Sequence, residues 1–221
     1  MANDSALTRR SLKTPKAAAI AGILFSVLLA AIFWLLRASL PADPLEPGQW
    51  LATSSYPVTL ALNLVPFAGI AFLWFIGALR DRLGPLEDRF FATVFFGSAL
   101  LFLAMLFAAA ATVGAIILTF ANAPDEMLNS TTFRFGRAVA YNVANIYAIK
   151  MAGVFMFSTS MVALYTGLTP RWIAILGFVL AGILLVGSYY ISWSFLVMPV
   201  WVFVISVCIL FDVFARPKQE A

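Results

Sequence analysis

The sequence predicts an all-α protein: a polytopic bundle of six transmembrane helices with both termini in the cytoplasm. The first reason is composition, because 63% of the 221 residues are hydrophobic and 11% are charged, whereas soluble domains are about half apolar and about a quarter charged. The second is that the apolar residues form stretches long enough to cross a bilayer. The third is that basic residues gather between these stretches on one side. The composition excludes a cytosolic globular enzyme, a disordered tail and a nucleic-acid-binding domain.

The first three expected spans contain no charged residue. Residues 17–36 are followed by Arg37, and residues 57–79 are followed by Arg80. Each stretch matches the roughly 20 apolar residues that a helix needs to cross the hydrocarbon core. Residues 90–121 are longer than this. The third helix is therefore expected to tilt, to bend or to project beyond the membrane.

The last three spans are less uniform. The fourth contains Lys150, and one of the polar residues 129–132 is expected to cap its first turn. Residues 172–215 are apolar almost throughout, and as one helix they would be about 66 Å long, about twice the bilayer core. A turn is therefore expected in the polar and aromatic cluster 188–194. The last three spans are then 138–166, 172–190 and 194–215.

Basic residues set the expected orientation. With residues 1–16 as a cytoplasmic basic tail and 216–221 as a second one, the single transmembrane domain 17–215 places most lysines and arginines inside, as the positive-inside rule requires. The formal net charge of +4 then reports topology and not an anionic partner. Trp74 and Trp201 lie deeper than the interfaces and are expected to be packing residues. The inner basic residues are Arg9, Arg10, Lys13, Lys16, Arg80, Arg82, Arg89, Arg171, Arg216 and Lys218, and the outer ones are Arg37, Arg134 and Arg137.

Several chemistries lack the residues they need. The sequence contains no histidine and a single cysteine, Cys208, so a haem with two histidine ligands, an iron–sulfur cluster and a conventional zinc site are not expected. No pair of carboxylates occurs within a span, so intramembrane catalysis is not expected either. We therefore expect no catalytic residues, no metal and no cofactor.

Polar residues at membrane depth are the candidates for a site. Lys150 lies 16 residues before Thr166, which places it about 24 Å from the inner boundary. Asn63 is expected at a similar depth on the second span. Together with Asn145 and Tyr147, these residues are a candidate outward-facing polar pocket for an anionic or carbonyl-bearing ligand. The alternatives are a lysine that snorkels to the interface and asparagines that form interhelical hydrogen bonds.

Two classes of function stay open. The favoured one is a structural, accessory or lipid-interacting bundle, with close helix contacts at residues 108–111, Gly177, Gly182 and Gly187. The alternative is a small transporter or channel protomer, not coupled to an ion, with its pocket around Lys150. Membrane lipids are the expected partners, a homo-oligomer or larger membrane complex is left open, and nucleic acid is not expected.

Two segments carry a family resemblance. The start of the first span, AAAIAGILF at 17–25, and the stretch LTPRWIAILG at 168–177 resemble segments of a bacterial family of uncharacterised multi-pass membrane proteins of about this length. The resemblance implies a multi-pass protein of a bacterial cell membrane. That family has no assigned activity, so the resemblance implies no functional residues.

Overall fold

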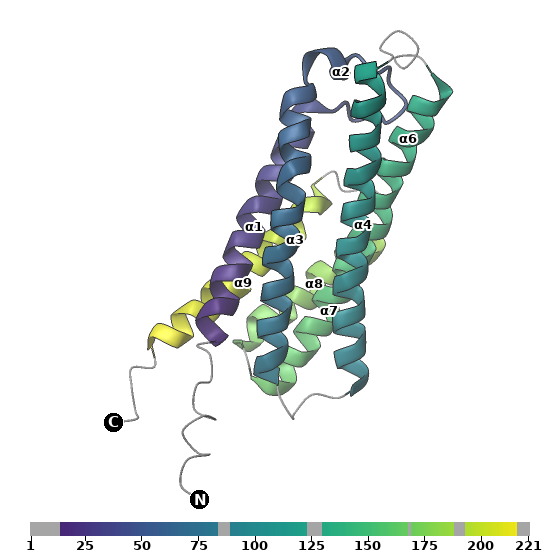
Figure 1. The fold of residues 1–221 in the computed structure, drawn as a ribbon. Coiled ribbons are helices and arrows are strands. Elements are labelled where there is room, and N and C mark those ends of the chain that lie inside the picture. Colours follow the sequence, from purple (N-terminus) through teal and green to yellow (C-terminus); the bar gives the residue numbers. More distant parts are fainter. Residues whose placement is uncertain (1–13, 84–88, 123–129, 168, 188–192, 216–221) are drawn as a thin grey trace, which may run out of the picture.

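The computed structural model describes residues 14–83, 89–122, 130–167, 169–187 and 193–215. Within these ranges the chain is helical and contains no strand, so the all-α prediction is confirmed for the described part (Figure 1). In chain order the helices are α1 (Thr14–Ser39), α2 (Trp50–Thr53), α3 (Ser55–Leu83), α4 (Arg89–Asn122), α6 (Thr131–Asn142), the π-helical η2 (Val143–Ala148), α7 (Ile149–Thr166), α8 (Arg171–Gly182), the π-helical η3 (Ile183–Gly187) and α9 (Ser194–Ala215).

Five of these helical segments are long and apolar enough to cross a membrane. The α8–η3 segment, Arg171–Gly187, is apolar but shorter. Large apolar side chains, among them Phe67 and Ile70, are exposed on the surface of the bundle, which suits a surface that faces lipid. The protein is therefore a multi-pass membrane protein. The five segments are Lys16–Ser39, Ser55–Arg80, Ala92–Asn122, Thr131–Tyr165 and Ser194–Phe211.

The helices run up and down between two ends of the bundle. We call the end at which α1 begins and α9 ends the base, and the opposite end, where α2 lies and α6 begins, the far end (Figure 1). α1 packs along α3 and α9, and α7 packs along α4 and α8. α9 begins well below the far end (Figure 1). The far end is therefore built by α1, α2, α3, α4 and α6.

The two longest helical paths reach beyond a bilayer core. α4 has 34 residues and is about 51 Å long, against about 30 Å for the hydrocarbon core. The α6–η2–α7 path begins at Thr131, before the expected residue 138. Ser130 caps it, because its side-chain oxygen accepts a hydrogen bond from the Phe133 N–H at 3.0 Å. The expected cap is confirmed, and the helix is longer than the apolar pattern indicated because α6 is amphipathic.

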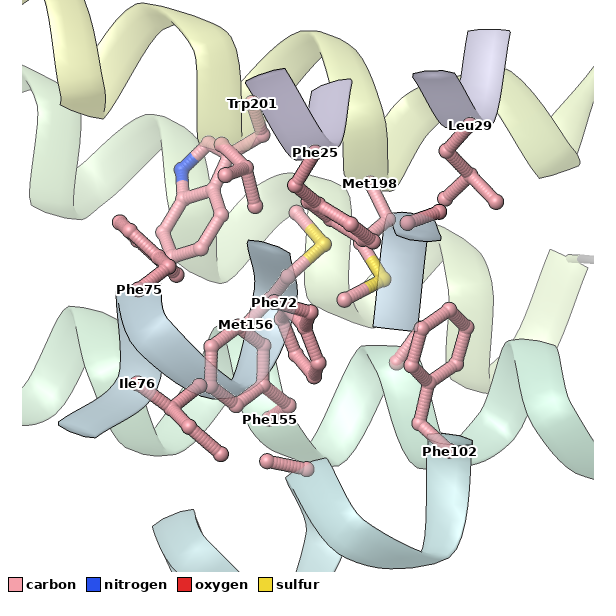
Figure 2. Close-up of a cluster of buried hydrophobic side chains, with 14 of the residues drawn as sticks. Phe25, Leu29, Phe72, Phe75, Ile76, Phe102, Phe155, Met156, Met198 and Trp201 are labelled. Carbon is pink, nitrogen blue, oxygen red and sulfur yellow. The ribbon is translucent and has the colours of Figure 1, made fainter. Parts of the chain in front are cut away.

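Aromatic rings fill the core in the middle of the bundle (Figure 2). Phe72 of α3 lies at the centre, with its ring centroid 4.6 Å from that of Phe25 on α1 and 5.3 Å from that of Phe155 on α7. Met156 and Met198 fill the space beside these rings (Figure 2). One apolar core therefore joins α1, α3, α7 and α9, and holds the scaffold on which the far end is built.

The two deep tryptophans behave differently. Trp201 of α9 is 1% exposed and packs in the core, as expected (Figure 2). Trp74 of α3 is 68% exposed, so its assignment as a packing residue was wrong. Depth along a span does not determine which face of the helix a residue occupies.

Two glycines allow close helix contacts. A Cβ added at Gly177 would overlap Oγ of Ser160, and one added at Gly22 would overlap Oγ of Ser206. A Cβ at Gly182 would meet nothing within 4 Å. The expected close contact is therefore confirmed at Gly177, where α8 meets α7 and α9, and not at Gly182.

Candidate functional site

A cavity of about 160 Å³ lies at the far end of the bundle. Its walls come from α1, α3, α4, α6, η2 and the first turn of α9, and from the loop that follows α1. Arg37, Ala42 and Tyr141 line it and are exposed, so the cavity opens to the surface beside them. We call it the far-end cavity. Its apolar walls include Ile32, Leu36, Leu62, Val65, Leu106 and Val113.

Arg137 is the buried charge of the far-end cavity. This residue of α6 is 7% exposed and lines the cavity. Its Nη2 donates to the carbonyl oxygen of Pro41 at 3.3 Å, and its guanidinium carbon lies 5.5 Å from the centroid of the Trp50 ring. Its Nε–H is buried and has no hydrogen-bond partner in the described part of the chain. A buried donor without an acceptor costs about 1–3 kcal/mol, so this atom calls for an acceptor.

Positively charged residues line the cavity, whereas the nearby negatively charged residues are exposed to solvent. Arg37 and Arg137 both line it, and no carboxylate does. The carboxylates of Glu46 and Asp43 are close enough to interact electrostatically with Arg137, but both are exposed on the loop after α1. Water screens exposed carboxylates, whereas the cavity walls are apolar. The cavity itself is therefore electropositive.

A second hollow lies on the outside of the same helices. It is a groove of about 560 Å³ between α3 and α4, and we call it the α3–α4 groove. Thr59 and Asn63 are its polar residues, and the rest of its lining is apolar. Ala111 and Gly114 of α4 supply small side chains along its floor.

The structure distributes the predicted pocket residues over different places. Asn145 of η2 lines the far-end cavity, and its Nδ2 donates to the Tyr141 carbonyl oxygen at 3.1 Å. Asn63 lines the α3–α4 groove and is exposed. Tyr147 is 56% exposed and lines neither hollow. Similar depth on two helices did not bring the two asparagines into one cavity.

Lys150 also lines neither hollow. Its Nζ donates to the carbonyl oxygen of Leu185 at 2.9 Å. Leu185 lies in η3 (Ile183–Gly187). The hydrogen bond from the lysine therefore links α7 to η3.

The described residues offer no metal site, since they contain no group of three or more histidine, cysteine, aspartate or glutamate side chains that could hold an ion. The chemistry available at the far-end cavity is therefore hydrogen bonding and charge: guanidinium donors, an amide, a phenol and apolar walls. Such a set is suited to recognise an anion.

The sequence reasoning missed Arg137 as a site residue and counted it only as an outer charge. A signal was present in the spacing. Phe133, Arg137 and Ala140 are four and three residues apart, which places them on one helix face. All three are buried. An arginine on the apolar face of an amphipathic helix was therefore the clue to the cavity.

Comparison with protein-family models, with curated proteins and with solved structures found no match. This agrees with the resemblance to a family without an assigned activity. A fold alone does not determine function. The function is therefore argued from the far-end cavity itself.

Proposed function

We propose that this protein is a lipid-interacting membrane protein that binds the anionic head group of an amphiphile in the far-end cavity. The unpartnered Nε–H of Arg137, buried beside an electropositive hollow, carries the proposal. A carboxylate or phosphate oxygen would accept that proton, and arginine donors suit both groups. The role is binding and not catalysis.

The proposed orientation places the base in the cytoplasm and the cavity outside. The basic residues of the sequence support it, since ten belong to the segments expected inside and three to those expected outside. The α8–η3 segment is proposed as the sixth span, because its 17 residues give a length of about 25 Å, close to the bilayer core. A bacterial cell membrane is the proposed location, from the family resemblance alone.

The size of the cavity limits what it holds. A cavity of about 150 Å³ accommodates a ligand the size of benzene, so 160 Å³ suits a head group with a few carbons and not a whole phospholipid. The apolar lining favours a ligand that carries carbon next to its charge. The proposed ligand class is therefore an alkyl carboxylate or alkyl phosphate.

Transport of the same ligand is the second candidate. The observation that favours it is η2, because this π-helical segment supplies Ala144 and Asn145 to the cavity wall. Interruptions of this kind are frequent at functional sites of helices. Uptake of a labelled alkyl phosphate into liposomes that contain the protein distinguishes the candidates, since a binding protein that does not transport leaves uptake at the protein-free rate.

The binding proposal is tested with the full chain in phosphatidylcholine nanodiscs. Butyl phosphate and butyrate are titrated against the native protein, Arg137→Gln and Arg134→Gln. Arg134 is a matched control, because it lies one turn away on α6 and is exposed. We expect Arg137→Gln to lose about tenfold or more in affinity, as for a buried charged partner, and Arg134→Gln to change little. The head group that binds more tightly identifies the chemistry, and equal affinities in native protein and Arg137→Gln contradict the proposal.

A further inference from the structure

The far-end cavity and the α3–α4 groove share a wall. Leu62 and Val65 of α3 and Ala110 of α4 line both hollows. These three residues therefore lie between the arginine-lined cavity and the groove. Two of them, Val65 and Leu62, lie on the α3 turn that is followed by Pro66. The two hollows are therefore neighbours through a thin, side-chain partition.

The helices that form the groove touch at one end and separate at the other. A Cβ added at Gly69 of α3 would overlap the Phe107 ring of α4, so the helices are in close contact there. A Cβ added at Gly114 would reach only Leu62, at an ordinary contact distance of 3.9 Å. Alanine and glycine on α4 leave the remaining space open. The groove therefore widens from Gly69 towards the far end.

The polar residues of the groove have no partners within the described chain. Asn63 and Thr59 are exposed, and the side chain of neither forms a hydrogen bond with a described residue. Pro66 has no N–H, so the Leu62 carbonyl lacks its usual helical donor. Asn63 lies 16 residues before Leu79, about 24 Å from the base side of a core about 30 Å thick. Unpaired polar groups are costly in the hydrocarbon core, so this end of the groove is expected to lie near the membrane interface.

We infer that the α3–α4 groove holds the alkyl chain of the same amphiphile whose head group the far-end cavity binds. The ligand class is then a single-chain membrane amphiphile with an anionic head, and it enters sideways from the outer leaflet past Leu62, Val65 and Ala110. This inference rests on the proposed binding function. Its support is the shared wall of residues that line both hollows, and the buried unpartnered Nε–H of Arg137, a residue that lines the cavity.

The test fills the groove without touching the cavity. Ala111 lines only the groove and is exposed, so Ala111→Leu adds volume there without crowding the core. Ala115 lies one turn further along α4, is exposed and lines neither hollow, so Ala115→Leu is the matched control. Both full-length variants are titrated in phosphatidylcholine nanodiscs with dodecyl phosphate, whose chain needs the groove, and with butyl phosphate, which fits within the cavity.

We expect Ala111→Leu to weaken dodecyl phosphate binding by about tenfold, because the added side chain fills the groove and excludes the alkyl chain. Butyl phosphate should bind Ala111→Leu as it binds the native protein, and Ala115→Leu should bind both ligands normally. Equal weakening of dodecyl phosphate in the two variants, or none in Ala111→Leu, overturns the groove as the chain site. That result leaves the cavity as the proposed head-group site. The proposed function itself is overturned if the native protein and Arg137→Gln bind butyl phosphate with equal affinity.

Discussion

Arg137 of α6 binds the backbone of Pro41, which lies 96 residues earlier in the chain, through a 3.3 Å hydrogen bond from Nη2 to the carbonyl oxygen. The guanidinium carbon of Arg137 also lies 5.5 Å from the centroid of the Trp50 ring. The arginine therefore fastens the loop between α1 and α2 over the far end. Its Nε–H has no partner in the described chain, and the same residue lines the far-end cavity.

The loop contact predicts a change in proteolysis. Arg137→Gln removes the Nη2 donor and the cation that faces Trp50, which together contribute about 1–2 kcal/mol. We expect the loop to open more often, and chymotrypsin to cut after the exposed Leu45 several times faster than in the native protein. Arg134→Gln is the control. An unchanged cleavage rate in Arg137→Gln contradicts the tethering role.

The acidic loop residues predict a charge effect on affinity. Glu46 is exposed and acts electrostatically on Arg137. We expect Glu46→Gln to raise the affinity for butyl phosphate by about 1.4- to fivefold, which matches the 0.2–1 kcal/mol of an exposed charge pair. Because salt screens such pairs, the gain should shrink in high salt. A gain that is independent of salt, or a loss of affinity, counts against this interpretation.

Lys150 of α7 is expected to contribute to the stability of the fold and not to ligand binding. Lys150→Met leaves the Leu185 carbonyl of η3 without its donor, and we expect a loss of about 1–3 kcal/mol in stability. Lys150→Gln keeps a donor, although with a shorter side chain, and should lose less. Thermal unfolding in detergent measures both. If Lys150→Met unfolds at the same temperature as the native protein but binds butyl phosphate more weakly, Lys150 contributes to ligand binding instead.

The two glycines of α8 predict opposite outcomes for the same substitution. Gly177→Ala places a methyl group against Oγ of Ser160 and the Trp201 ring, and overpacking of a tight core costs about 1–3 kcal/mol. Gly182→Ala meets nothing within 4 Å. It should be neutral or slightly stabilising, since alanine is the better helix former. Equal unfolding temperatures for the two variants contradict the close contact at Gly177.

Local features of the sequence predicted much of the fold. Long apolar stretches specify membrane helices because the backbone must satisfy its own hydrogen bonds in lipid. A serine before an amphipathic segment specifies a helix start, and Ser130 caps α6 as expected. A glycine in an apolar helix indicated a close contact, which Gly177 makes.

The site depends on which helix faces meet, and no local pattern contains that information. Lys150 and Asn63 were matched by depth, but depth leaves the position around the bundle open. Lys150 turns to η3 and Asn63 to the α3–α4 groove. The far-end cavity is lined by residues of α1, α3, α4, α6, η2 and α9, so it is a property of the assembled bundle. Only the buried-face spacing of Arg137 carried a sequence signal for it.

The contact between the Arg137 Nε–H and a bound head group is visible by NMR of the protein with isotope-labelled arginine. The Arg137 signal is assigned by its absence in Arg137→Lys, and the protein is titrated with butyl phosphate in nanodiscs. We predict a saturable shift of the Arg137 Nε–H signal, with the Arg134 signal unchanged. Binding of butyl phosphate that leaves the Arg137 signal in place, or no binding at all, would contradict the assignment of the far-end cavity as an anion site.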